Sequence, residues 1–69
     1  MLVIVINDSF AKGNKGFRNG INTFYYSELN SGEFVCSIES LRDFPELFNE
    51  VSVSFKDITE NDFKQQATV

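Results

Sequence analysis

The side chains that carry out catalysis are scarce in this chain. Its 69 residues include no histidine and a single cysteine, Cys36. Nucleophilic catalysis needs a nucleophile beside a base, and the usual zinc sites need histidine or several cysteines. The ten acidic residues show no paired spacing, and no loop has the oxygen-ligand spacing of a calcium site. We therefore expect a protein that is not an enzyme, with no cofactor and no metal.

The basic residues are concentrated in one glycine-rich segment, residues 12–20, with the sequence Lys-Gly-Asn-Lys-Gly-Phe-Arg-Asn-Gly. Three basic residues against one acid give residues 1–20 a net charge of +2. Three against nine give residues 21–69 a net charge of −6, and the whole chain carries −4. Glycines let backbone amides approach an anion closely. The segment nevertheless lacks the Gly-Lys-Ser/Thr pattern and the following helix of a phosphate-binding loop.

A solvated surface loop is the simplest interpretation of this segment, and contact with a protein or a nucleic acid is the functional one. The candidate partner-binding residues are Lys12, Lys15, Phe17, Arg18 and Tyr25. Arginine and aromatic side chains are common hot spots of interfaces. Phe17 distinguishes the two interpretations. An exposed ring would be an anchor, whereas a ring packed into the core, the commoner outcome in a small domain, would serve stability.

Two adjacent tyrosines follow the loop. In an extended segment neighbouring side chains point to opposite faces, so Tyr25 and Tyr26 should separate. We expect one of them on the less covered face of the sheet, near Val35. There it would form a partly exposed aromatic patch, unless the C-terminal helix covers that face.

Hydrophobic periodicity predicts the elements that position these residues. Residues 2–6 form an unbroken aliphatic run, which is typical of a central strand covered on both faces. Alternating segments on either side of a Leu-Asn-Ser-Gly turn predict a hairpin. Pro45 suits the first turn of a helix, and Thr59 with Asp62 forms a capping box. The predicted strands are 2–6, 21–28, 33–38 and 51–55, and the predicted helices are 43–50 and 59–66.

These elements predict one small α+β domain over residues 1–69. Its mainly antiparallel four-stranded sheet would carry one packed helix and a short C-terminal helix, in the order β-β-β-α-β-α. Cys36 lies on the apolar face of its strand and should be a core residue. The N-terminal aliphatic run is too short to span a bilayer. We expect a cytoplasmic protein without membrane contact, in the host cytoplasm if the chain is viral.

Another protein is the first expected partner, and the oligomeric state stays open. Nucleic-acid or anion binding through the same loop is the main alternative, although the net acidity argues against general coating of phosphates. The spaced acidic residues also allow an inhibitor that mimics DNA. A purely structural subunit, which associates through an exposed sheet edge, is a further class.

Residues 16–20, Gly-Phe-Arg-Asn-Gly, continue to Phe24, and Pro45-Glu46-Leu47 precedes a short Val-Ser-Val segment at 51–53. In these features the chain resembles small Mu-like prophage proteins, over residues 2–53. Those proteins have Gly-Phe-Arg-x-x-Gly-x-x-Phe after a hydrophobic strand, whereas this chain is one residue shorter before its second glycine. The resemblance implies a phage or prophage α+β module of unsettled function, used in assembly or in contacting another protein.

Overall fold

Strand β1 (Leu2–Ile6) is the centre of the fold, because all five of its side chains are aliphatic and both of its faces are covered. It pairs antiparallel with β5 (Phe34–Ser37) on one side and with β6 (Ser54–Asp57) on the other. Ile4 and Ile6 point to one face, and Val3 and Val5 to the opposite face. The prediction of a central strand covered on both faces is confirmed.

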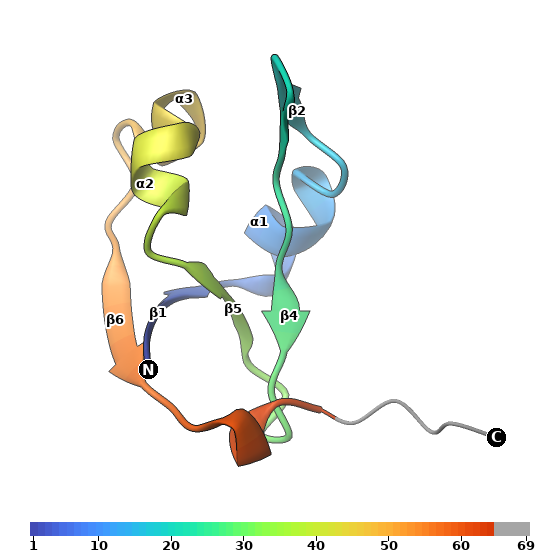
Figure 1. Ribbon diagram of the computed structural model, residues 1–69, viewed down its shortest axis with the longest axis vertical. Coiled ribbons are helices and arrows are strands. Elements are labelled where there is room, and N and C mark those ends of the chain that lie inside the picture. The colour runs from blue at the N-terminus through green and yellow to red at the C-terminus, as the bar shows by residue number, and fades with distance from the viewer. Residues whose placement is uncertain (65–69) are drawn as a thin grey trace, which may run out of the picture.

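The computed structural model describes residues 1–64 (Figure 1). It confirms the predicted α+β class, with an antiparallel four-stranded sheet of order β4-β5-β1-β6. No helix in this described part is long and apolar enough to cross a membrane. The other elements are α1 (Asp8–Gly13), β2 (Arg18–Asn19), β3 (Asn22–Thr23), β4 (Ser27–Glu28), α2 (Ser40–Asp43), α3 (Pro45–Phe48) and the 3-10 helix η1 (Glu60–Asp62).

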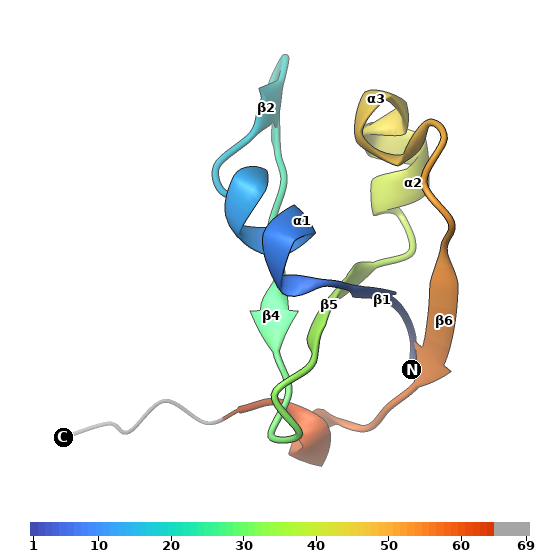
Figure 2. The ribbon, with the colours of Figure 1, turned by 180° about the vertical axis from the view of Figure 1, so that it is seen from behind.

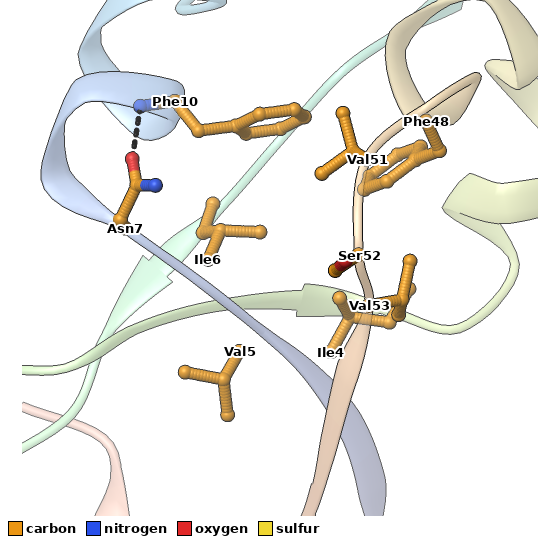
Figure 3. A pocket seen from close by; sticks show the side chains of 9 residues that line it. All are labelled: Ile4, Val5, Ile6, Asn7, Phe10, Phe48, Val51, Ser52 and Val53. Atoms are coloured by element: carbon orange, nitrogen blue, oxygen red, sulfur yellow. Dashed lines mark hydrogen bonds between the residues drawn. The ribbon is translucent and has the colours of Figure 1, made fainter.

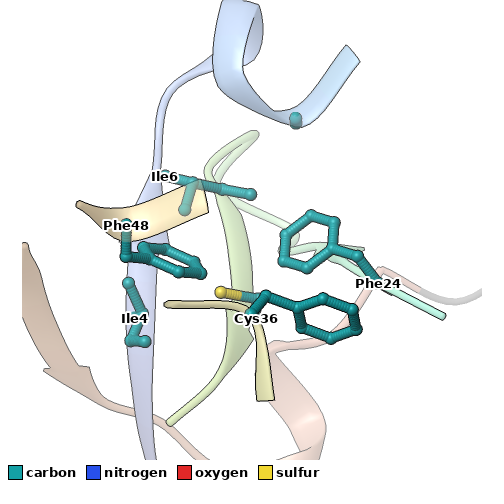
Figure 4. Close-up of a cluster of buried hydrophobic side chains, with 7 residues drawn as sticks. Ile4, Ile6, Phe24, Cys36 and Phe48 are labelled. Atoms are coloured by element: carbon teal, nitrogen blue, oxygen red, sulfur yellow. The ribbon is translucent and has the colours of Figure 1, made fainter. Parts of the chain in front are cut away.

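The first core lies on the face of Ile4 and Ile6, beneath the helices (Figure 4). Its buried members are Ile4, Ile6, Ala11, Phe24, Cys36, Phe44 and Phe48. Aromatic rings dominate it: Phe24 lies edge-on to Phe44, with ring centroids 5.7 Å apart, and edge-on to Phe48 at 6.2 Å. Such pairs add to the free energy of burial. The rings therefore supply much of the buried apolar surface of this small domain.

The second core lies on the opposite face of the sheet and is smaller. Its buried members are Val3, Leu29, Val35 and Ile58, with Val5 and Phe63 packed partly against them. The segment around η1 supplies two of these side chains. In Figures 1 and 2, η1 lies at one end of the long axis, whereas hairpin β2–β3 and helices α2 and α3 lie at the other. The second core has four buried members against seven in the first, so the second face is the less covered one.

Helix α1 was not predicted, because Asn7-Asp8-Ser9 resembles a simple turn. Asn7 is in fact its N-cap, and the side-chain oxygen accepts a hydrogen bond of 2.7 Å from the Phe10 amide. Asp8 in the first turn and Lys12 in the last suit the helix dipole and form an ion pair. The helix buries Ala11 and turns Phe10 onto Phe48, with ring centroids 5.2 Å apart. Tertiary packing stabilises a helix too short to persist alone.

Replacing Asn7 by alanine should lower the free energy of unfolding by about 1 kcal/mol, because the Phe10 amide loses its capping acceptor. Urea unfolding followed by circular dichroism measures the change. Asn61→Ala is the matched control, because that side chain is exposed and the hydrogen bond at this residue uses its backbone carbonyl. An Asn7 variant as stable as the wild type would contradict the capping role.

The predicted strand 21–28 is interrupted. Residues 22–23 pair within the small hairpin β2–β3, residues 24–26 are irregular, and only 27–28 join the main sheet as β4. The predicted hairpin with the next strand is confirmed at Ser27↔Val35 and Glu28↔Phe34. Gly32, at φ 93, makes the turn in a region that glycine enters without strain. The interruption lets Phe24 enter the first core.

The predicted helix 43–50 is wrong in its bounds and continuity. Two short helices, α2 and α3, occur, separated at Phe44, which has φ −131 and ψ 59. Pro45 causes the break, because proline lacks an amide donor and disfavours helical geometry in the residue before it. Pro45 does lie in the first turn of α3, as predicted. Phe44, Leu47 and Phe48 all pack on the first core.

The last two predicted elements are displaced or shortened. Strand β6 begins at Ser54 rather than 51, and Phe55 is 53% exposed. The capping box of Thr59 and Asp62 is confirmed, with a bond of 2.8 Å from the Thr59 amide to the Asp62 carboxylate. It starts a 3-10 turn of three residues rather than a helix over 59–66. Residues 65–66 of that prediction lie outside the described residues.

Candidate functional site

Hairpin β2–β3 forms the end of the molecule opposite η1 (Figure 1). Arg18 pairs with Thr23 and Asn19 with Asn22, which leaves Gly20 and Ile21 as a two-residue loop. Gly20 has φ 63, the conformation that the first loop position of a type II′ turn requires. The Phe24 amide donates to the Phe17 carbonyl at 2.8 Å and closes the base of the hairpin. The Asn19 side chain also donates to the Asp43 carbonyl of α2, at 3.2 Å.

Ile21 at the tip of this hairpin is 98% exposed, more than any other large apolar side chain described. Strand geometry explains the exposure, because a residue in a two-residue loop projects beyond both strands. Exposed apolar residues are common one at a time. Ile21 differs because a tethered hairpin holds it at the end of the molecule. It is placed to enter a recess on another molecule.

Two predicted residues meet beside the hairpin. Lys15, Thr23 and Tyr25 line one shallow hollow, and Arg18 is directly opposite Thr23 in the ladder. Tyr25 is 76% exposed. No ion pair of Lys15 or Arg18 occurs within residues 1–64. We name the set Lys15, Arg18, Ile21 and Tyr25 the hairpin surface. It combines two cationic groups, one aliphatic tip and one aromatic ring.

The other two predicted partner-binding residues have structural contacts instead. Lys12 is in the last turn of α1, and its ammonium group lies 3.2 Å from the Asp8 carboxylate. Phe17 is partly buried, and its ring lies edge-on to Phe44 with centroids 6.1 Å apart. Phe17 therefore ties the base of the hairpin to the first core. Of the two positions that the sequence allowed for the Phe17 ring, packed into the core or exposed as an anchor, the structure shows the packed one.

The two tyrosines separate as predicted. Tyr26 packs on the first core, with its ring centroid 5.6 Å from that of Phe34. Both tyrosines line a mostly apolar hollow with Val3, Val35 and Phe63, and Tyr25 is the exposed ring of the two. The expected position near Val35 is thus confirmed. Phe63 lines this hollow and leaves Tyr25 exposed.

Ion pairs neutralise several of the acidic groups. The Lys56 hydrogen bond lowers the pKa of Glu33, and the N-terminal ammonium group lowers the pKa of Asp57. Lys64 contacts Glu28, and Arg42 contacts Asp43. Because these pairs are exposed, each contributes little to stability. They leave the net charge of residues 21–69 at −6, so this acidic part of the molecule contrasts with the cationic hairpin surface.

A small, partly open cavity lies beside β1 and α1, and the Asn7 side-chain oxygen that lines it is already hydrogen-bonded within the protein. Ile4, Phe10, Phe48 and Val53 are among its lining residues, and the volume is about 60 Å³ (Figure 3). Ligand pockets usually measure several hundred Å³. The Asn7 oxygen at its rim already accepts the Phe10 amide. This cavity is therefore a packing defect where residues 51–53 diverge from β1.

Cys36 is a free thiol in the interior of the protein. Burial raises the pKa of the Cys36 thiol, whose side chain lies in the first core. Within residues 1–64, no cluster of three or more histidine, cysteine, aspartate or glutamate residues has the geometry to hold a metal ion. In the same part of the chain, no buried side-chain nitrogen or oxygen lacks a hydrogen-bond partner.

Ile21 is the member of the hairpin surface that the sequence analysis missed. The predicted strand 21–28 placed it at the start of a strand rather than in a loop. The signal that could have found it is Gly20-Ile21, because glycine at the first of two loop positions is typical of a type II′ hairpin turn. Comparisons with family models, curated proteins and solved structures found no match to this chain.

Proposed function

We propose that this protein is a non-enzymatic interaction module that binds another protein through the hairpin surface. The near-complete exposure of Ile21 at the tip of a tethered hairpin supports this proposal most directly. Burying one such side chain in a partner contributes roughly 1.5–3 kcal/mol. The hydrogen bonds at the base of the hairpin hold the tip in place, so little conformational entropy is lost on binding. An assembly or inhibitory protein of a phage fits this description.

The chemistry of the hairpin surface specifies the partner. Lys15 and Arg18 favour a carboxylate-rich rim, and Ile21 favours an apolar recess inside that rim. Tyr25 adds an aromatic ring with a polar end, a common component of interfaces. The expected partner is therefore an acidic protein with a small apolar pocket. The rest of this chain, which is itself acidic, repels the rim and directs contact to the hairpin.

Changing Ile21 to aspartate should weaken partner binding by about tenfold to a hundredfold, the equivalent of losing its burial. The protein is immobilised, captured partners from the source cell are identified, and their affinities are measured with purified components. Ile21→Val keeps the apolar contact and should bind almost normally. Equal affinity for both variants would contradict insertion of the tip.

Arg18→Glu tests the cationic part and should lower the rate of association, because electrostatic complementarity steers the encounter. Lys64→Glu makes an equivalent charge reversal near η1, far from the hairpin (Figure 1), and should leave binding unchanged. Equal effects of the two reversals would indicate a response to net charge alone, not to this surface.

Nucleic-acid binding by the same surface is a second candidate, because an exposed ring, Tyr25, lies beside Lys15. Aromatic rings stack on unpaired bases, and nearby cations neutralise phosphates. A short single-stranded oligonucleotide should then bind, and its affinity should fall steeply as salt increases. Tyr25→Ala should weaken this complex. No mobility shift with DNA or RNA at low salt would remove this candidate.

A further inference from the structure

The outer edge of β6 is an open sheet edge, whereas the opposite edge of the sheet is covered. Beside β4, Leu29 bridges to Phe63, and the Lys64 amide donates to the Glu28 carbonyl at 2.9 Å. Both views show β6 at the outer side of the sheet with no element beyond it (Figures 1 and 2). The order β4-β5-β1-β6 gives it no second neighbour within residues 1–64. An open edge is a template for another strand.

The backbone groups that face outward from β6 can be identified. The Met1 ammonium donates to the Ile58 carbonyl at 2.7 Å, and the Ile58 amide donates to the Met1 carbonyl at 2.8 Å. In an antiparallel ladder such hydrogen-bonded pairs alternate with non-bonded ones. In this register Lys56 and Ser54 therefore direct their amide and carbonyl groups toward β1. Phe55 and Asp57 direct theirs outward.

Several exposed apolar side chains lie near this edge, on the face of the sheet that carries the first core. Leu2 is 49% exposed and Phe55 is 53% exposed, on the neighbouring strands β1 and β6. Ile38, which follows the end of β5, is 39% exposed. Phe55 lies opposite Ile4, so its ring and Leu2 belong to the same face. A molecule that added a strand to β6 would also cover part of this apolar strip.

Two common protections against edge pairing, a proline and a β-bulge, are absent from β6, whose four residues pair with β1 in continuous register. The one lysine, Lys56, is held by Glu33 on the far side of β1. Its charge is thereby neutralised across the sheet. Lys56 therefore does not act as the exposed edge charge that usually prevents pairing.

We propose that a second copy of this chain occupies the edge, with the two β6 strands antiparallel and Phe55 opposite Phe55 of the other copy. If a two-fold axis perpendicular to the sheet relates the two copies, each side chain stays on its own face of the joined sheet. The residue at the axis must then pair with the same residue of the other copy. Centring on Lys56 would place two lysines opposite each other, which is unfavourable. Centring on Phe55 aligns outward-facing backbone groups and makes an aromatic cross-strand pair. The apolar strips of the two copies then become continuous.

The register makes a cross-linking prediction. In a hydrogen-bonded antiparallel pair the two Cα atoms are about 5.5 Å apart, within the range that a disulfide spans. Phe55→Cys should therefore form a covalent dimer under mild oxidation. Ser54→Cys is the matched control on the same strand, because its two copies are diagonal neighbours at about 7–8 Å, too far for a disulfide. Ile21→Cys, at a more exposed but distant position, controls for random collision.

Equilibrium measurements provide an independent test. Sedimentation or light scattering over a range of concentrations should show a monomer–dimer equilibrium for the wild type. Because each copy carries a net charge of −4, added salt should favour the dimer. Phe55→Glu should raise the dimer dissociation constant at least about tenfold, whereas Ile21→Glu should not change it. Circular dichroism confirms that each variant is folded.

Three results would overturn this pairing. The first is a wild type that stays monomeric at its highest soluble concentration in high salt. The second is a dimer that Phe55→Glu does not weaken. The third is cross-linking at position 54 as efficient as at position 55. If changing Ile21 abolished the dimer and changing Phe55 did not, the dimer interface would be the hairpin surface and not the edge of β6.

Discussion

Phe24→Ala is expected to lower the free energy of unfolding by about 3–5 kcal/mol and to leave much of the protein unfolded at 25 °C. Phe24 is 2% exposed, and its ring lies within 6.4 Å, centroid to centroid, of the rings of Phe10, Tyr26, Phe44 and Phe48. These rings come from three segments of the chain: α1, the irregular residues before β4, and the stretch from Phe44 to Phe48. A small domain of this size has a total stability of only about 3–10 kcal/mol. Losing this ring therefore removes a large fraction of it.

The matched control is Phe55→Ala, the same chemical change at a ring that is 53% exposed. It should change the stability of the monomer by no more than about 0.5 kcal/mol, when measured at low protein concentration. Urea unfolding monitored by circular dichroism gives both values. If the two variants lost equal stability, Phe24 could not be the centre of the first core.

The Cys36 thiol is expected to react with a thiol reagent only when the protein opens. Cys36 is 3% exposed, and burial raises the pKa of the thiol, so little of the reactive thiolate is present. Labelling in the native state should be slower than in urea by at least about a hundredfold, in proportion to the fraction unfolded. Absorbance of the released chromophore measures both rates. Phe24→Ala should accelerate native-state labelling strongly, whereas Phe55→Ala should not.

Fast labelling of Cys36 is the outcome that would contradict its burial. Fast labelling of the folded wild type would mean that the thiol is accessible and ionised, contrary to its position among Ile4, Ile6, Phe24 and Phe48 (Figure 4). A chemical role for Cys36 would then return. Under the structure described here, the thiol is a small apolar core group.

Local sequence signals correctly predicted those parts of the fold whose causes are local. The aliphatic run at residues 2–6 required burial on both faces and became the central strand β1. The capping box of Thr59 and Asp62 formed as predicted. Pro45 was correctly expected in the first turn of a helix, although its disruption of the preceding helical turn was not. These features depend on hydrogen bonds or steric limits within a few residues.

Tertiary packing determined the features that the sequence analysis missed. Residues 8–13 form a helix because Phe10 and Ala11 find a core to pack against, which no short window reveals. Residues 24–26 leave the predicted strand for the same reason, since Phe24 is more favourably buried among rings than held in the sheet edge. In both segments burial outweighed the local turn or strand pattern.

The candidate site also has features that the sequence predicted and features that only the tertiary structure determined. Composition alone identified residues 12–20 as the one basic segment of an acidic chain, and it identified Lys15, Arg18 and Tyr25 within or near it. The choice between an exposed and a buried Phe17 required the position of Phe44, whose ring it contacts. The exposure of Ile21 required the register of β2 and β3. The sequence alone determines which side chains are charged or apolar. Only the tertiary structure determines which of them are buried in the core and which are exposed to a partner, because burial depends on contacts between segments that are distant in the sequence.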